Sequence, residues 1–582
     1  MNALIRLLVL IAGACALVQA PLSGQPIADG IFRTDSRVHP VVADEGMVVS
    51  AEAAATRAGV RVLREGGNAV DAAVTTAFTL AVTLPRAGNL GGGGFLVVHS
   101  AVMDETRTLD FRETAPAAAS RDMFLGPDGE ADPALSRRSH LAVGVPGTVA
   151  GLLEALERYG TRPRARVLEP AIRFARTGIA VSPSMADSLA AYREELAASP
   201  AALALFFEDG DPERPLSAGS LLLQPDLGQT LERIRDRGRD GFYRGETAAA
   251  IAADMQANGG LITLRDLAGF RPVWREPVTG TYRGYRIASM PPPSSGGIHL
   301  VQMLNILGGW DIEPGELGSA AHAHRLIETM RLAFADRSKF LGDPDFVRVP
   351  QERLTDQAYA DRLRVRIDPE RATPSSAVEP GHGIIPTESF ETTHISVIDR
   401  LGNAASVTLT LNSSYGIRHV VPGTGFFLNN EMDDFSAQAG VPNLYGLVGG
   451  EANAVAPGKR MLSSMTPTLV FGPDGNIFAA TGSPGGPRII TTVLQVLVNL
   501  IDFRLNPAEA TLAPRVHHQW LPDVVRIERG MSPDTRALLE AKGHRVETGG
   551  TLGAAQTIVR LPDKTLQGFS DSRRRGGLAA GH

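Results

Sequence analysis

The stretch ESFETTHISVIDRLGNAASVTLTLN, residues 388–412, determines how the fold of this chain is interpreted. From His394 onward apolar and polar residues alternate, and THISVID and NAASVTLTL are joined by only RLG. This pattern predicts a hairpin of two buried strands. The preceding residues 371–390 are rich in Pro, Ser, Gly, Glu and Thr, which predicts an exposed, mobile segment. Thr392 and Thr393 therefore stand where such a segment meets a buried strand.

The remaining pattern is a mixture of helices and antiparallel strands. Two helices are predicted in residues 50–84, the first closed by Gly66 and Gly67 and the second capped by Asn68. A strand pair follows at residues 95–100 and 106–113, after a glycine run (GNLGGGG, 88–94) that we interpret as tight packing. Residues 145–345 are predicted to be mostly helical, with a rigid loop at 291–297. Hairpins at 466–481 and 557–569 and helices at 488–503 and from Pro533 complete an α+β pattern, because the strands cluster in hairpins.

Composition places the chain among ordinary globular proteins. It has 582 residues, of which 43% are hydrophobic and 21% charged, and it is long enough to bury a large core. A net charge of -6 gives no electrostatic reason to expect nucleic acid or an anionic membrane as a partner. Small molecules fit this composition better.

The N-terminus resembles a secretory signal peptide. Arg6 precedes an apolar run from Leu7 to Val18 that is too short to span a bilayer, and small residues follow it. We assign residues 1–28 to this signal, with cleavage anywhere from 16 to 28, and expect a periplasmic or secreted protein. Cys15 is the only cysteine, so the mature chain should have neither disulfides nor thiol catalysis. The apolar run at 489–501 contains Thr, Gln and Asn and is predicted to be a buried helix rather than a membrane span.

Common catalytic signatures are absent from the sequence. There is no G-x-S-x-G, H-E-x-x-H or Walker A motif. His517 and His518 are adjacent, without the spacing of a metal site, and are interpreted as surface or core histidines. We therefore expect no metal and no organic cofactor, which leaves hydroxyl chemistry.

Thr392 is the candidate nucleophile. A threonine hydroxyl needs a base beside it, and the residue's own amine serves when the residue is N-terminal. An α-amine has a pKa near 8, so it accepts a proton at working pH without a histidine. Cleavage between Glu391 and Thr392 would create that amine. Taken alone, however, the pair of threonines is more often an ordinary strand feature.

The motifs that follow Thr392 carry a strong resemblance to the gamma-glutamyltransferase family. TTHISVID, TLTLN, LNNEMDDFS, KRMLSSMTPT and GSPGGPRII resemble its small-subunit motifs in order, and GGNAVDAAV, AGNLGGGGF, DFRETAP and SMPPPSSGG resemble its large-subunit motifs. The resemblance covers the chain from about Gly46 to the C-terminus. It implies an N-terminal-nucleophile hydrolase fold, a four-layer αββα sandwich formed by two self-cleaved subunits. These would be residues 29–391 and 392–582, held together as a heterodimer.

The resemblance also implies roles for individual residues. Thr392 is the nucleophile of self-cleavage and turnover, Thr410 supports it, and the backbone of Gly485 and Gly486 forms the oxyanion hole. The amino-acid head of the substrate is expected to bind a further set of side chains and one carbonyl: Arg112, Ser463 and Ser464 for the carboxylate, and Glu431, Asp434 and the Asn412 carbonyl for the ammonium group. Without the family, capping and salt bridges would explain most of these residues.

Residues 439–450 resemble a lid loop found in some family members, with Tyr445 at its tip and glycines as hinges. This loop favours a gamma-glutamyl enzyme, acting on glutathione and related compounds with water, amino acids or dipeptides as acceptors, over a related glutaryl acylase. An amino-acid-binding protein is the alternative outside enzymes. The sequence departs from the family pattern at Ile395, where an aromatic is common, and at Glu391, where Gln or Asn is frequent.

Overall fold

The computed structural model describes residues 36–378, 392–438, 440–441 and 443–582. The chain divides into two units, Met1–His39 and Pro40–His582. The predicted signal peptide, Glu391 and most of the predicted mobile segment lie outside the described residues. Residues 36–39 contain no helix or strand.

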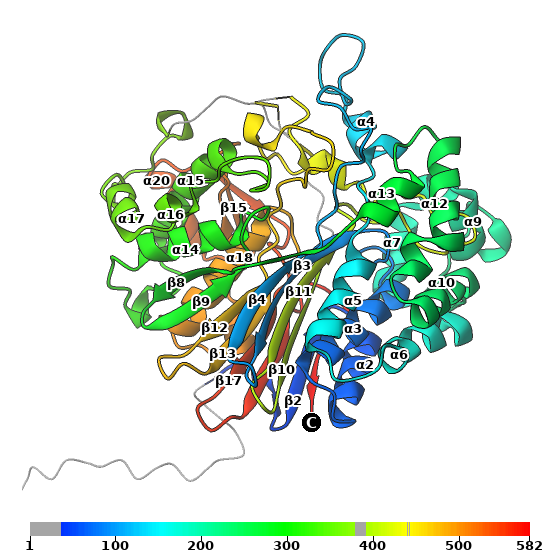
Figure 1. Ribbon diagram of the computed structural model, residues 1–582. Helices are drawn as coiled ribbons and strands as arrows, with labels where there is room; N and C mark the ends of the chain where they lie inside the picture. The colour runs from blue at the N-terminus through cyan, green and yellow to red at the C-terminus, as the bar shows by residue number, and fades with distance from the viewer. Residues whose placement is uncertain (1–35, 379–391, 439, 442) are drawn as a thin grey trace, which may run out of the picture. The chain divides into compact units, whose positions relative to one another are not determined.

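Two seven-stranded antiparallel sheets form the centre of the second unit (Figure 1). The first has the order β1 (Val41–Ala43), β18 (Leu566–Ser570), β17 (Gln556–Arg560), β13 (Ile477–Gly482), β12 (Thr468–Phe471), β9 (Tyr285–Ser289), β8 (Val278–Tyr282). The second has the order β19 (Leu578–Gly581), β2 (Gly46–Ser50), β10 (Thr392–Asp399), β11 (Ala404–Thr410), β3 (Gly93–Ser100), β4 (Glu105–Asp110), β7 (Val273–Arg275).

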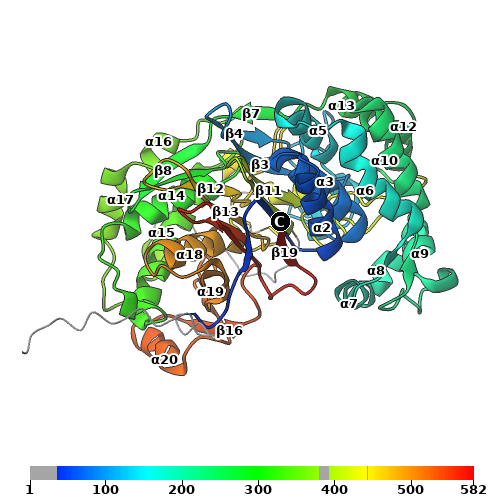
Figure 2. The same ribbon diagram turned by 90° about the horizontal axis from the view of Figure 1, so that it is seen from below.

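Helices cover the outer face of each sheet, and Figure 2 shows them on opposite sides. The second sheet is covered by α2 (Ala53–Arg64), α3 (Ala69–Thr83), α5 (Thr148–Tyr159) and α6 (Arg164–Thr177), and the first by α14 (Gly296–Leu307), α15 (Ala320–Phe340), α18 (Arg488–Ile501) and α19 (Pro507–Leu512). Apolar side chains from both sheets, such as Val97, Ile398 and Leu469, fill the space between them. The predicted four-layer αββα architecture is confirmed.

Smaller elements complete the unit. The helices are α4 (Pro133–Arg137), α7 (Pro183–Ala191), α8 (Arg193–Ala197), α9 (Pro200–Phe206), α10 (Pro225–Arg237), α11 (Asp240–Tyr243), α12 (Gly245–Ala257), α13 (Leu264–Gly269), α16 (Gln351–Leu354), α17 (Gln357–Arg364) and α20 (Pro533–Ala541). The strands are β5 (Ile179–Ala180) with β6 (Leu221–Leu222), and β14 (Val516–His517) with β15 (Val525–Glu528) and β16 (Val546–Gly549). No helix within the described residues is both long and apolar enough to cross a bilayer.

Local sequence explains the predicted elements. The Asn68 side chain accepts hydrogen bonds from the backbone N–H groups of Val70 and Asp71 at the start of α3. The Asp71 side chain accepts in return from the backbone N–H of Asn68, which completes a capping box. The glycine run packs tightly, because a Cβ at Gly92 would lie 2.1 Å from the carbonyl oxygen of Thr410. The predicted hairpin is β10 and β11, with Thr392 opposite Thr410. Helix α18 is buried along its whole length, as expected.

Residues 145–345 are mostly helical, as predicted, but they also contain strands that the sequence pattern does not indicate: β5, β6, β7, β8 and β9. In β8 only Val278 and Tyr282, at its two ends, are buried, so the strand lacks the alternation of a half-buried strand. Strand β9 pairs on one edge with β8, across the short turn at Arg283 and Gly284, and on its other edge with β12, almost two hundred residues away in sequence. The predicted loop at 291–297 is also shorter, because α14 begins at Gly296.

Candidate active site

Thr392 is the first residue of a central strand and lies at its end. Its side chain is only 3% exposed, and its Oγ1 donates a hydrogen bond of 3.4 Å to Oγ1 of Thr410. The Thr410 hydroxyl also accepts from the backbone N–H of Asn412 at 2.8 Å. The antiparallel register of β10 and β11 brings the two threonines together, so the local fold holds the predicted nucleophile beside its predicted partner.

A small cavity of about 20 Å³ contains the Thr392 side chain. Among the described residues, every predicted site residue except Gly485 lines this cavity. The lining consists of Arg112, Thr392, Thr410, Asn412, Glu431, Asp434, Tyr445, Leu447, Ser463, Ser464, Met465, Gly486 and Ile489. Gly485 lines a larger neighbouring cavity, and both glycines have positive φ angles, 131° for Gly485 and 55° for Gly486.

Arg112 lies at the centre of a buried charge cluster. Its guanidinium donates to the carboxylates of Glu431 and Asp434 and, through Nε, to the Met461 carbonyl at 3.3 Å. The carboxylate of Glu113 lies 3.9 Å away. The residues predicted to bind a substrate carboxylate and those predicted to bind an ammonium group thus contact each other directly in this structure.

Three buried carboxyl groups share this one guanidinium, which changes their protonation. Burial raises the pKa of Glu431, and neighbouring carboxylates raise it further against the opposing charge of Arg112. Burial likewise raises the pKa of Asp434 and that of Glu113. Like charges so close together cannot all ionise at neutral pH, so the cluster retains a proton. A cationic group entering beside Glu431 and Asp434 would stabilise their ionised forms.

Two serines form another wall of the cavity. The Ser463 hydroxyl accepts from the backbone N–H of Met465 at 3.1 Å, and the Ser464 hydroxyl accepts from Arg337 at 3.2 Å. Arg337 comes from α15, is 4% exposed and also donates to Ser295. Arg337 is not predicted from the sequence, because no motif near it in α15 marks it as part of a site.

The loop with Tyr445 closes the cavity. The Tyr445 hydroxyl donates to the Asn412 carbonyl at 2.5 Å, and its ring packs against Gly486, where a Cβ would lie 2.7 Å from Cδ1. The Asn412 carbonyl, which we expected to face a substrate ammonium group, is therefore engaged by Tyr445 here. Residues 439 and 442 of the predicted lid lie outside the described residues.

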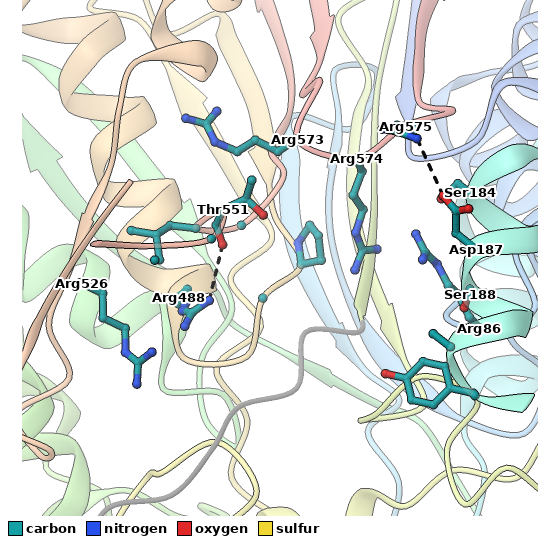
Figure 3. A pocket seen from close by; sticks show the side chains of 18 residues that line it. Arg86, Ser184, Asp187, Ser188, Arg488, Arg526, Thr551, Arg573, Arg574 and Arg575 are labelled. Carbon is teal, nitrogen blue, oxygen red and sulfur yellow. Dashed lines mark hydrogen bonds and ion pairs between the residues drawn. The ribbon is translucent and has the colours of Figure 1, made fainter. Parts of the chain in front are cut away.

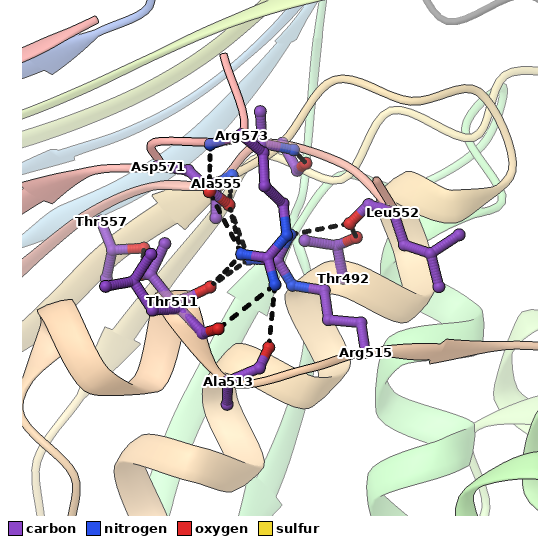
Figure 4. Close-up of polar contacts among 12 residues, drawn as sticks. Thr492, Thr511, Ala513, Arg515, Leu552, Ala555, Thr557, Asp571 and Arg573 are labelled. Atoms are coloured by element: carbon purple, nitrogen blue, oxygen red, sulfur yellow. Dashed lines mark hydrogen bonds and ion pairs between the residues drawn. The ribbon is translucent and has the colours of Figure 1, made fainter. Parts of the chain in front are cut away.

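Arg574, near the C-terminus, contacts the predicted nucleophile by donating to the Thr392 carbonyl at 2.7 Å. Its neighbours anchor the segment, as Figure 4 shows. Arg573 donates to Thr511 O at 2.8 Å and to Glu528, and Asp571 accepts from Arg515 at 2.7 Å. Arg574 is not among the residues predicted above, although three consecutive arginines at 573–575 are a visible signal.

No histidine lines the Thr392 cavity among the described residues. His394 is buried beside Thr408 and Ser396, and burial lowers its pKa to about 3, so it is neutral. His517 and His518 are core residues. Within the described part of the chain, two groups of side chains could hold a metal ion, and neither lines the Thr392 cavity: His140, Asp254 and His419, and His324, Glu328 and His544.

Known proteins match both the sequence and the fold. The gamma-glutamyltranspeptidase family model matches residues 55–581. The chain is 51% identical over 574 residues to the glutathione hydrolase proenzyme of Escherichia coli (strain K12), covering 98% of each chain. The crystal structure of cephalosporin acylase from Bacillus halodurans superposes with a TM-score of 0.82 at 29% identity, covering 96% of this chain and 99% of that chain. That of Helicobacter pylori gamma-glutamyltranspeptidase gives a TM-score of 0.56 at 43% identity, covering 60% and 97%.

The architecture is therefore that of the N-terminal-nucleophile hydrolases, with two antiparallel sheets between helical layers. Sequence identity over nearly the full length is far above what a shared fold alone would explain. The chain belongs to the gamma-glutamyltranspeptidase family.

Proposed function

We propose that this chain is a self-processing gamma-glutamyltransferase that cleaves the gamma-glutamyl amide of glutathione and related compounds. Thr392 carries the reaction, and water or an amino acid or dipeptide resolves the resulting ester. The observation that supports this most directly is the position of Thr392, at the start of β10 and inside a closed cavity that also contains a buried arginine, buried carboxyl groups and two serines.

The first step forms a covalent intermediate. Thr392 Oγ1 attacks the gamma-carbonyl carbon, and its proton passes to the free amine of Thr392 and then to the departing nitrogen. The negative oxygen of the tetrahedral intermediate is stabilised by the backbone N–H groups of Gly485 and Gly486. The C–N bond breaks and leaves a gamma-glutamyl ester on Thr392. Water or an acceptor amine then attacks the ester carbonyl, the C–O bond breaks, and Thr392 recovers its proton.

The cluster around Arg112 selects the head of the substrate. In the proposed complex the α-carboxylate takes the place of a protein carboxylate on Arg112, with hydroxyl groups from Ser463 and Ser464. The α-ammonium group lies between Glu431 and Asp434. An acyl group without this amino-acid head would leave buried polar groups unpaired, so it would be a poor substrate.

Maturation is part of the proposal. Removal of a signal within residues 1–28 would export the chain to the periplasm or the medium, and cleavage before Thr392 would give a large subunit of residues 29–391 and a small one of residues 392–582. Strand β10 of the small subunit lies between β2 of the large subunit and β11 of its own, so the sheet itself would hold the heterodimer together.

A glutaryl acylase is the second candidate, because the chain superposes on a cephalosporin acylase over 96% of its length. Turnover of gamma-glutamyl and glutaryl p-nitroanilides distinguishes the two, since these substrates differ only in the α-amino group. We expect the gamma-glutamyl anilide to react at least about a hundredfold faster, as the loss of a paired ammonium group implies. Faster release from the glutaryl anilide would assign the acylase activity instead, and Thr392→Ala serves as the blank.

A further inference from the structure

Two histidines and an aspartate, His140, Asp254 and His419, meet outside the Thr392 cavity. His140 begins the short 3-10 helix η1 (His140–Ala142), Asp254 lies in the last turn of α12, and His419 lies in the loop that follows β11. Nε2 of His140 donates to Oδ2 of Asp254 at 3.2 Å, and Nε2 of His419 donates to Oδ1 at 2.8 Å. Both histidines therefore direct the same ring nitrogen at one carboxylate.

The surrounding structure holds this cluster in place and leaves it accessible. Asn258 donates to the Asp254 side chain at 3.2 Å, which orients the carboxylate. A Cβ at Gly260 would lie 3.0 Å from Cβ of His140, so glycine permits the close packing of these two segments. The side chains of His140 and His419 are 12% and 19% exposed, so a small solute can reach them from solvent.

The carboxylate of Asp254 is buried without an arginine or lysine partner among the residues that the structure describes. Elsewhere an arginine supplies the opposite charge, as Arg575 does for Asp187 at 3.8 Å (Figure 3). Arg418, the neighbour of His419, pairs with Glu195 instead. When both imidazoles are neutral, the cluster therefore keeps a negative charge, and a bound cation would compensate it.

The three side chains match the preferences of a zinc ion. Zn²⁺ binds imidazole nitrogen and carboxylate oxygen at roughly 2.0–2.2 Å in a tetrahedron, which places the ligand atoms about 3.3 Å from one another. The two nitrogen–oxygen distances in the cluster are 3.2 and 2.8 Å, and all three ligand atoms lie within 4.8 Å of one another. Each neutral imidazole would carry its proton on Nδ1 instead of Nε2, and a water molecule would complete the tetrahedron.

The other group of possible ligands, His324, Glu328 and His544, suits a cation less well. All three residues are buried, and Glu328 accepts from the guanidinium of Arg331 at 3.3 Å, so a positive charge is already present there. Nδ1 of His324 and Nε2 of His544 are hydrogen bonded to each other at 2.8 Å, and Nε2 of His324 is bonded to the Asp368 carbonyl at 2.7 Å. The ring nitrogens that would bind a cation are thus engaged within the protein.

We propose that His140, Asp254 and His419 bind a Zn²⁺ ion that joins the two subunits. His140 and Asp254 belong to residues 29–391, and His419 belongs to residues 392–582. The site itself does not depend on the proposed function, whereas a link between separate chains rests on the proposed cleavage before Thr392. Because none of the three ligands lines the Thr392 cavity, the ion stabilises the fold and takes no part in acyl transfer.

Zinc titration of the whole protein tests this inference. The protein is purified without a histidine tag, treated with EDTA, dialysed and titrated with Zn²⁺ by calorimetry, and the zinc that remains after gel filtration is measured by mass spectrometry. We expect one bound ion for each pair of subunits. Co²⁺ in place of Zn²⁺ should give the visible absorption of a tetrahedral site, which reports on the ligand geometry of the wild type without any substitution.

Two variants locate the ion. His140→Gln and His419→Gln replace partly exposed side chains, and each should weaken Zn²⁺ binding by at least about tenfold, since even residues that only orient a ligand contribute this much. Saturating Zn²⁺ should raise the Tm of the wild type by about 2 °C or more, and that of the variants by less. His39→Gln, at an exposed histidine outside the cluster, is the control and should bind as the wild type does.

The outcomes separate this inference from the proposed function. A wild-type protein that binds no Zn²⁺ would overturn the inference, and so would binding that both cluster variants retain, because the ion would then lie elsewhere. Thr392→Ala, the chain expected to stay whole, should bind Zn²⁺ as tightly as the wild type, since the fold brings the three ligands together without cleavage. If the wild type binds Zn²⁺ at these histidines but is never cleaved before Thr392, the site is confirmed and the proposed function is wrong.

Discussion

Arg574 and Thr392 are 182 residues apart in sequence, and the guanidinium of the first donates a 2.7 Å hydrogen bond to the carbonyl oxygen of the second. This hydrogen bond fixes the first peptide group of β10 against the C-terminal segment. It also places a permanent positive charge beside Thr392, where negative charge would develop in the proposed acyl transfer.

Replacing Arg574 with Gln should therefore impair catalysis. Loss of a charge-assisted hydrogen bond costs about 1.5–3 kcal/mol, which corresponds to a fall of about ten- to a hundredfold in kcat/KM for gamma-glutamyl p-nitroanilide. Arg574→Lys keeps the charge, so its kcat/KM should lie between that of the wild type and that of Arg574→Gln. Arg529→Gln, an exposed arginine, is the matched control, and an Arg574→Gln variant as active as this control would refute the positioning role.

Gly486 permits the close approach of Tyr445. Its φ is 55°, and a Cβ there would lie 2.7 Å from Cδ1 of the tyrosine ring. Gly486→Ala should displace the Tyr445 loop as well as strain the backbone, so we expect KM for gamma-glutamyl donors to rise by about fivefold or more. Gly475→Ala is the control, because Gly475 also has a positive φ, 80°, but nothing within 4 Å of its Cβ position.

Both glycine variants carry a backbone penalty of about 1–2 kcal/mol, so thermal unfolding should show a loss of stability in both, and a larger one in Gly486→Ala, where the Cβ also meets the Tyr445 ring. Hydrogen exchange of the Tyr445 loop should increase only in Gly486→Ala. Equal kinetics in the two variants would mean that contact with Tyr445 does not influence substrate binding.

Glu113 makes the stability of the protein depend on pH. Burial raises its pKa from 4.5 to about 7, so the folded protein keeps a proton that the unfolded chain releases. The free energy of unfolding should therefore fall as pH rises from about 4.5 to about 7, and change little from this group above that range. In Glu113→Gln this contribution is absent.

Thermal melts of wild type and Glu113→Gln across this range test the sign. The Tm of the variant relative to wild type should increase with pH, and the increase should level off above about pH 7. Glu547→Gln, at an exposed glutamate, is the control and should follow the wild type. Parallel curves for Glu113→Gln and wild type would show that Glu113 ionises normally.

Features with a local signal were predictable from the sequence. The strands of the hairpin that begins at Thr392 alternate in polarity and are joined by a short connection. Asn68 and Asp71 form a capping pattern that their residue types make recognisable. The sequence pattern does not indicate β8 and β9, although they form a local hairpin, because β8 lacks the alternation of a half-buried strand and the other edge of β9 pairs with β12, which is distant in sequence.

The residues of the candidate site likewise divide into those with a local sequence signal and those without one. Thr392, Arg112 and Asp434 stand in motifs long enough to be identified, and the fold brings them to one cavity. Arg337 and Arg574 reach the site from a helix interior and from the C-terminal segment. Their roles depend on the packing of the two sheets, which the sequence of either segment does not encode by itself.

The proposed chemistry requires a new amino terminus at Thr392, and intact-mass analysis with N-terminal sequencing of purified active protein tests this most directly. Self-cleavage predicts a small fragment of 582 - 391 = 191 residues that begins Thr-Thr-His-Ile-Ser, and a Thr392→Ala chain that stays whole and inactive. An active protein that remains a single uncut chain, or a Thr392→Ala chain that still divides at this point, would contradict it.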